Sequence, residues 1–196
     1  MARKKKATSK GDTRRRLFVR PLKYWFTSVW QYAELCKETK KPSYLLGLLN
    51  LVLAPLVVSV VSILILKGGF ANIDLAPYPP VILVSLAKYG LLAFAFAFVV
   101  AATKKVSLRK MFYMATFPLA GYLVLVDSSL IMAKLIAGFP TAIALKSLLI
   151  LFVIAETGIA KEEAKMDYWA AGLWAIAALA LADWVGPQVA ALVASL

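Results

Sequence analysis

Histidine is absent from this chain of 196 residues, and cysteine occurs once, as Cys36. Without histidine, and with a single thiol, the chain cannot by itself assemble the ligand sets that proteins commonly use for zinc, copper or haem. A histidine general base is excluded as well, and so is a disulfide within the chain. We therefore expect no metal and no other cofactor.

The sequence also lacks the motifs of common enzymes. It contains no nucleophile paired with a base, no glycine-rich phosphate loop and no readable pair of catalytic carboxylates. Residues 1–16, MARKKKATSKGDTRRR, have no apolar core of the kind that a cleavable signal peptide needs. These absences predict a protein that is not an enzyme and whose first apolar segment directs its insertion into a membrane.

Long apolar runs, in contrast, dominate the chain. Hydrophobic residues make up 62% of it, and its mean hydropathy is +0.78. A soluble helical protein would need a polar face on most of its helices, and these runs have none. Each run is long enough for a helix to cross about 30 Å of hydrocarbon. The sequence therefore predicts an all-α integral membrane protein with five transmembrane helices, at residues 44–66, 81–102, 112–136, 141–160 and 168–185.

Charge is distributed unequally between the two ends of these predicted spans. Acidic residues number 10 against 23 basic ones. One side of the spans carries 19 basic residues, 13 of them within residues 1–41, whereas the other side carries only Lys67. Because short cytoplasmic loops are enriched in lysine and arginine, the N-terminus is predicted to be cytoplasmic and the C-terminus external.

Residues 1–16 form a basic tail that we predict to be disordered. Attraction to anionic lipid headgroups contributes about 1 kcal/mol per basic residue near a membrane surface. Contact with nucleic acid is the alternative, but the tail has no ordered module that would read one, so we do not expect it. The residues predicted to contact lipid headgroups are Arg3, Lys4, Lys5, Lys6, Arg14, Arg15 and Arg16.

Residues 17–42 connect this tail to the transmembrane domain of residues 43–196. From Pro21 onward, apolar residues recur at the spacing of one helix face, and Pro42 ends the segment. Tryptophans beside basic residues predict a helix over residues 21–37 that lies in the cytoplasmic headgroup plane. Docking of the same face onto another protein is the alternative. The side chains predicted at the membrane interface are Trp25, Phe26, Val29 and Trp30.

Six ionisable side chains fall inside the predicted spans. Lys134 and Glu156 lie near span ends, where we expect them to reach water without a partner. An unpaired charge deeper in the membrane costs on the order of 3 kcal/mol on insertion scales, so the others should form at least one interhelical ion pair. These others lie at similar depth in the outer half of four helices: Lys88, Asp127, Lys146 and Asp183.

Consecutive spans joined by short loops tend to be neighbours, which favours the pairs Asp127–Lys88 and Asp183–Lys146, although the partners could be exchanged. In one interpretation the four charges are structural bridges that determine helix packing. In the other, Asp127 and Asp183 bind or relay protons or cations in a transporter.

The last predicted span carries a small residue at every fourth position. Such a row lets another helix approach closely, either within the chain or on a partner subunit or second copy. Its members are Ala178, Ala182, Gly186, Ala190 and Ala194.

The layout as a whole resembles the Yip-domain family of five-span membrane proteins. The approach RPLKYWFTSV at residues 20–29 and the segment KKVSLRKMFYMATFPLAGYLVL at residues 104–125 carry the resemblance. It implies a cytoplasmic N-terminus and five closely packed spans, and it supplies no catalytic residues. Eukaryotic members interact with Rab GTPases and have a long acidic N-terminal region. The short basic tail here indicates a prokaryotic relative, located in the cell membrane.

Three hypotheses about function are compatible with these observations. The first is a non-enzymatic Yip-type scaffold that organises the membrane and its partner proteins. The second is an accessory subunit of a larger membrane complex, in which other subunits carry the chemistry. The third is a small proton- or cation-coupled transporter that uses Asp127 and Asp183.

Overall fold

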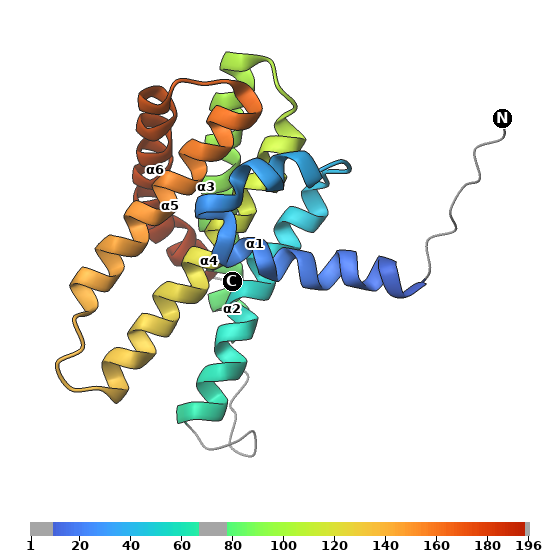
Figure 1. Cartoon of the computed structure of the whole chain (residues 1–196). Coiled ribbons are helices and arrows are strands. Elements are labelled where there is room, and N and C mark those ends of the chain that lie inside the picture. The colour runs from blue at the N-terminus through green and yellow to red at the C-terminus, as the bar shows by residue number, and fades with distance from the viewer. Residues whose placement is uncertain (1–9, 67–77, 195–196) are drawn as a thin grey trace.

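Figure 1 shows the computed structural model, which describes residues 10–66 and 78–194. The described residues form helices and no strand, so the protein is all-α. The six helices are α1 (Lys10–Glu38), α2 (Tyr44–Leu66), α3 (Tyr78–Lys104), α4 (Leu108–Leu135), α5 (Thr141–Ala164) and α6 (Tyr168–Ala194).

Four of these helices contain a stretch long and apolar enough to cross a membrane. Even the shortest of the four, with 19 residues, extends about 28 Å along its axis, close to the thickness of a bilayer core. Helix α2 contributes a shorter apolar stretch, Tyr44–Val58. The four long stretches identify an integral membrane protein: Leu86–Lys104, Leu108–Leu135, Thr141–Ala164 and Tyr168–Gln188.

Helix α4 lies at the centre of the bundle. Helices α2, α3 and α5 pack along it, α1 packs on α4 and α5, and α6 packs on α3 and α5 (Figure 1). Most side chains of α4 from Met111 to Val124 are buried, and this segment supplies much of the hydrophobic core. The core therefore sits around the first half of α4.

Two tight turns at one end of the bundle hold successive helices side by side. Ser107 caps α4, since its hydroxyl oxygen accepts a hydrogen bond from the backbone N–H of Lys110 at 3.4 Å. Lys165 ends α5 in the left-handed conformation, with φ 51°, and its N–H donates to the carbonyl of Ala160. The turns leave α3 next to α4 and α5 next to α6.

The helix bounds differ from the predicted ones mainly at the two ends of the chain. Helix α1 begins at Lys10, so the backbone at 10–16 is helical where the sequence predicts disorder. Its first part projects away from the bundle (Figure 1). Helix α6 continues past the predicted end of its span to Ala194. Of the predicted headgroup contacts, Arg3 to Lys6 and the side chains of Arg14, Arg15 and Arg16 lie outside the described part of the chain.

Candidate functional site

A cavity of about 370 Å³ lies between α3, α4, α5 and α6. Two oppositely charged side chains and two tyrosines give it a polar part, and aliphatic side chains form the rest of its wall. The lining residues are Lys88, Tyr89, Leu92, Tyr122, Leu149, Val153, Ile176, Leu179, Ala180 and Asp183.

Lys88 and Asp183 form an ion pair at this cavity, between α3 and α6. The Lys88 Nζ lies 2.6 Å from Oδ1 of Asp183 and 5.6 Å from the centre of the Tyr89 ring. The partners differ from those predicted, because Lys88 pairs with Asp183 and not with Asp127. The reason is the packing of α3 along α6, two helices that are not consecutive in the chain.

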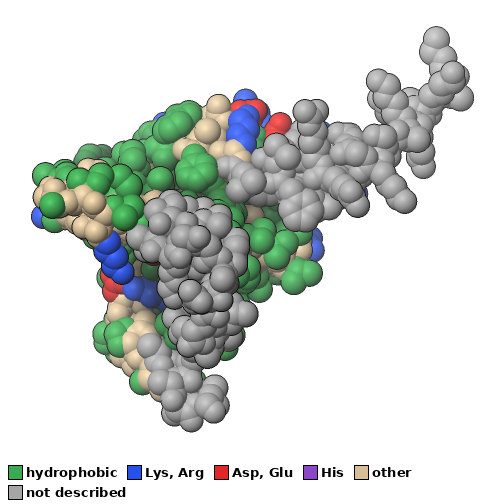
Figure 2. All heavy atoms as spheres, turned by 90° about the horizontal axis from the view of Figure 1, so that it is seen from below, with side chains coloured by type: hydrophobic (Ala, Val, Ile, Leu, Met, Phe, Trp, Pro, Cys, Tyr) green, Lys and Arg blue, Asp and Glu red, His purple; other side chains and the backbone are tan. Residues whose placement is uncertain are grey.

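Asp127 and Lys146 stand apart from this pair. Asp127 is half-buried on α4, Lys146 is exposed on α5, and no described residue forms an ion pair with either. The structure thus contains neither predicted pair, Asp127–Lys88 or Asp183–Lys146. Both Asp127 and Asp183 nevertheless contribute negative potential at Tyr89, which lines the cavity. Figure 2 shows basic and acidic side chains beside one another on a largely hydrophobic face.

The prediction that Glu156 reaches water is wrong. Its side chain is fully buried, and neither carboxyl oxygen has a hydrogen-bond partner among the described residues. An unpaired carboxylate in such a place costs several kcal/mol or more, a cost that protonation avoids. The prediction rested on the distance from the span end, and it was wrong because this end of α5 is covered by other helices.

Glu156 shares a face of α5 with the cavity. It follows Val153 by three residues and Leu149 by seven, and side chains at these spacings lie above one another on a helix. Both of those residues line the cavity. Glu156 therefore lies about one turn beyond the cavity wall, toward the packed core.

The small residues of α6 pack within the chain where the structure describes their side chains. Ala178, Ala182 and Gly186 are buried. A Cβ atom at Gly186 would lie 3.1 Å from the Lys88 Cδ, so this glycine makes room for the lysine of the ion pair. The side chains of Ala190 and Ala194 lie outside the described part.

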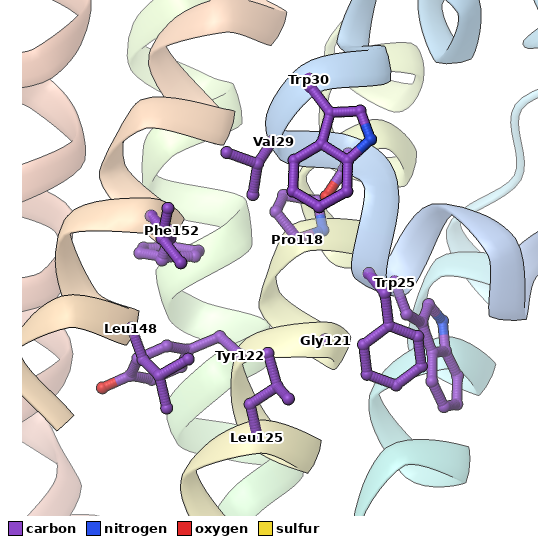
Figure 3. A pocket seen from close by; sticks show the side chains of 12 residues that line it. Trp25, Val29, Trp30, Pro118, Gly121, Tyr122, Leu125, Leu148 and Phe152 are labelled. Carbon is purple, nitrogen blue, oxygen red and sulfur yellow. The ribbon is translucent and has the colours of Figure 1, made fainter. Parts of the chain in front are cut away.

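The four predicted interface residues lie on different sides of α1. Trp25 is 3% exposed and faces α4, Val29 is half-buried, and Phe26 and Trp30 are 43% and 66% exposed. Figure 3 shows Trp25, Val29 and Trp30 around a groove of about 250 Å³ whose other walls are α4 and α5. Part of the predicted apolar face thus docks on the protein's own bundle.

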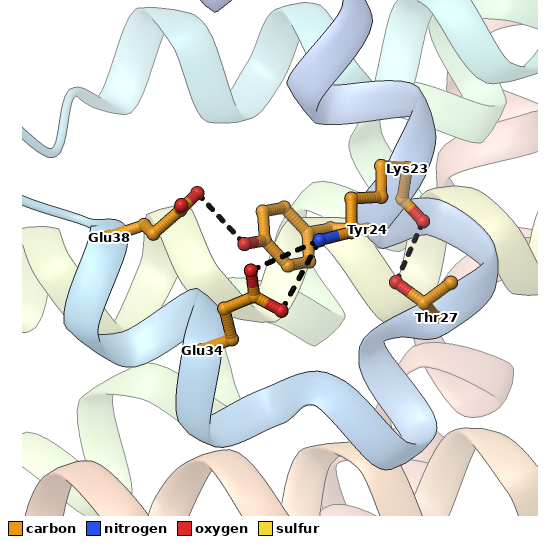
Figure 4. Close-up of polar contacts among 5 residues, drawn as sticks. All are labelled: Lys23, Tyr24, Thr27, Glu34 and Glu38. Carbon is orange, nitrogen blue, oxygen red and sulfur yellow. Dashed lines mark hydrogen bonds and ion pairs between the residues drawn. The ribbon is translucent and has the colours of Figure 1, made fainter.

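Helix α1 is bent at Gln31, which has φ −110° and ψ 23°. Lys23 Nζ lies 3.1 Å from a carboxyl oxygen of Glu34, and the Tyr24 hydroxyl donates to Glu38 at 2.8 Å (Figure 4). Residues eleven apart in a straight helix are about 16 Å apart along the axis, so these contacts need the bend. The predicted helix over residues 21–37 is therefore broken into two arms.

Two glycines let α1 lie close to the bundle. A Cβ atom at Gly121 of α4 would overlap the backbone carbonyl of Trp25. A Cβ atom at Gly158 of α5 would lie 2.6 Å from the ring of Tyr32. Backbone contact of this kind is common where membrane helices pack through small residues.

Cys36 lies in α1 near the ion pair of Lys110 and Glu163, whose atoms Nζ and Oε2 are 2.6 Å apart. Burial, aided by the negative charge of Glu163, raises the pKa of the Cys36 thiol to about 12. The thiol is therefore protonated at neutral pH and is a poor nucleophile.

The described residues contain no group of three or more cysteine, aspartate or glutamate side chains that could hold a metal ion. Comparison of the chain with protein-family profiles, with curated proteins and with solved structures found no match. The buried carboxyl and the cavity beside it are the features from which a function can be argued.

Proposed function

We propose that this protein is a proton-coupled membrane transporter in which Glu156 binds the proton. One observation carries the proposal: a fully buried carboxyl without a partner lies next to a cavity that contains charged side chains. Ionisable groups inside membrane segments are costly and therefore mark functional sites by default. A purely structural carboxyl would be expected to have a hydrogen-bond partner.

A proton fits this site better than a metal cation does. Sodium, calcium and magnesium ions are held by several oxygen ligands, whereas the described residues offer no cluster of acidic side chains. A single carboxyl can bind a proton without other ligands, and the neutral acid is the form that an apolar site favours.

The charged side chains of the cavity suggest how the proton arrives. Asp183 is 72% exposed while its partner Lys88 is 27% exposed, so the acid is the more accessible member of the pair. Protonation of Asp183 would weaken its attraction to Lys88, and Asp127 adds a second acceptor nearby. In this proposal Asp127 and Asp183 collect protons, and Glu156 holds one inside the bundle.

The proposal includes five transmembrane helices, with α2 as the first, and a cytoplasmic N-terminus. The 23 residues of α2 and the excess of basic residues on one side support this arrangement. In a Cys36→Ser background, a membrane-impermeant maleimide should label Ala137→Cys in intact cells and Lys104→Cys only after permeabilisation. The opposite labelling would reverse the orientation.

Charge movement after a pH jump tests the proton-binding role directly, because it needs no knowledge of the transported substrate. Proteoliposomes on a capacitive electrode should give a transient current when the external pH is lowered. We expect Glu156→Gln to abolish most of this current without lowering the melting temperature, since glutamine resembles the neutral acid in size.

Glu162→Gln is the matched control, because it makes the same chemical change six residues further along α5. It should leave the current unchanged. Absence of a current in the wild-type protein, or an equal current in Glu156→Gln, would rule out Glu156 as the proton-binding group.

The scaffold and accessory-subunit hypotheses stay predictions. Neither accounts for an unpartnered buried carboxyl, and the Yip resemblance assigns no role to Glu156. Solubilising the native protein and measuring its mass distinguishes them, because a stoichiometric complex would favour the accessory subunit.

A further inference from the structure

The groove between α1, α4 and α5 is lined almost entirely by apolar and aromatic side chains. Trp25, Val29 and Trp30 approach from α1, Leu125 from α4, and Leu148 and Phe152 from α5 (Figure 3). No charged side chain is among its lining residues. A ligand that fills this groove must therefore be uncharged over the buried part of its length.

Two hydrogen-bond donors at the groove lack an acceptor. The indole N–H of Trp25 and the hydroxyl of Ser28 are both buried, both residues line the groove, and neither polar atom has a partner among the described residues. Buried donors in native proteins nearly always have a partner. A serine in a helix can usually donate to the carbonyl four residues earlier, as Ser128 does to Val124. Ser28 does not, so its hydroxyl is a buried donor without an acceptor at the wall of the groove.

The groove opens on an exposed, apolar side of the protein. Its rim includes exposed Phe26 and Trp30, and its two long walls belong to membrane-length helices. Hydrocarbon chains surround such helices at high concentration.

We propose that this groove binds an acyl chain of a glycerolipid, with an ester carbonyl oxygen that accepts a hydrogen bond from Ser28 or Trp25. The carbonyl supplies the acceptor that both donors lack, and the chain supplies the uncharged, apolar body. The groove shares the wall residue Tyr122 with the cavity near Glu156, but the binding of a lipid chain in it does not depend on the proposed transport function.

Quenching of Trp25 fluorescence measures entry of a chain into the groove. The other four tryptophans, Trp30, Trp169, Trp174 and Trp184, are replaced by phenylalanine, which leaves a single buried reporter. Detergent-purified protein is titrated with phosphatidylglycerol that carries bromine on one acyl chain. We expect saturable quenching that unbrominated phosphatidylglycerol reverses by competition.

The ether-linked analogue of the same lipid isolates the hydrogen bond. One net hydrogen bond corresponds to a preference of roughly 2- to 10-fold for the ester lipid. Ser28→Ala should reduce this preference, and Ser129→Ala, whose hydroxyl bonds within its own helix, should retain it. Leu148→Phe should block quenching by filling the groove, whereas Leu173→Phe on the exposed side of α6 should not.

Three results would overturn the proposal. Quenching that rises without saturation, and that Leu148→Phe does not change, would show ordinary contact with surrounding lipid. Equal affinity of the wild-type protein for ester and ether lipids would show that no ester carbonyl accepts a hydrogen bond in the groove. Quenching that is lost when dilution separates a dimer into monomers would show that a second copy, and not this groove alone, forms the binding site.

Discussion

The two halves of the α4–α5 pair differ sharply, although both helices are apolar enough to cross a membrane. In the half near the α5–α6 turn, which we call the packed half, α4 is buried from Met114 to Ala120 and α5 from Ala155 to Ala160. In the other half, which we call the open half, side chains such as Leu135, Ile143 and Ile150 are between 51% and 69% exposed. Figure 1 shows these connected ends of α4 and α5 standing away from α2.

Neighbouring helices cause this difference, since hydropathy does not. The windows of α4 and α5 have mean hydropathies of 1.5 and 2.0, and both count as membrane spans. Helix α1 docks on the packed half, where Gly121 and Gly158 let it approach closely. The charges inside the two predicted spans follow the same division: Glu156 is buried in the packed half, whereas Asp127, Lys134 and Lys146 lie in the open half. Burial in this protein therefore depends on which helices meet.

The largest expected effect tests the docking of α1 on the packed half. Gly121→Ala would force the Trp25 backbone away from α4, because no side-chain rearrangement can relieve the overlap. We expect a loss at or above the upper end of the ~1–3 kcal/mol typical of overpacking. Unfolding by SDS in mixed micelles measures it.

Gly90→Ala is the control for this substitution. The nearest atom to its added methyl group would be Leu48 Cδ2 at 3.8 Å, an ordinary contact. This variant should be as stable as the wild-type protein. Equal stability of both alanine variants would mean that α1 does not rest on Gly121.

A double-mutant cycle tests the ion pair at the cavity. Lys88→Met leaves Asp183 without its partner, so we expect a loss of about 1–3 kcal/mol, whereas the double variant Lys88→Met with Asp183→Asn should be milder. Lys134→Met, at an exposed helix end, should change stability by less than about 0.5 kcal/mol. Strictly additive effects of the two substitutions would show that Lys88 and Asp183 are not energetically coupled.

The smallest expected effects come from removing one polar contact in each half and comparing the losses in stability. In the packed half, Nδ2 of buried Asn50 donates to the Thr116 hydroxyl at 3.2 Å, which joins α2 to α4. Asn50→Leu should cost about 0.6 kcal/mol, and at most about 1.7. Ser129 in the open half donates only to Leu125 of its own helix, so Ser129→Ala should have almost no effect. A larger loss for Ser129→Ala would mean that the open half is covered in the folded protein.

Part of the site could be anticipated from residue type and depth. Lys88 and Asp183 were expected to need partners because a lone charge inside a membrane is costly, and they are bonded to each other. Their pairing could not be read from the order of spans, because α3 packs along α6. The bend at Gln31 was also invisible, since the apolar spacing on either side of it continues as in one straight helix.

The sequence by itself determined that the chain is helical and belongs in a membrane, because a continuous apolar run of this length can satisfy all its backbone hydrogen bonds within itself by forming a helix. Such runs are apolar on every side, so they do not say which face meets a neighbour. Only the tertiary structure decided that, and with it which acid is exposed and which is sealed. Asp183 lies deep in its span yet is open at a cavity, whereas Glu156 lies near a span end yet is fully buried, because α5 is enclosed there by the helices packed around it.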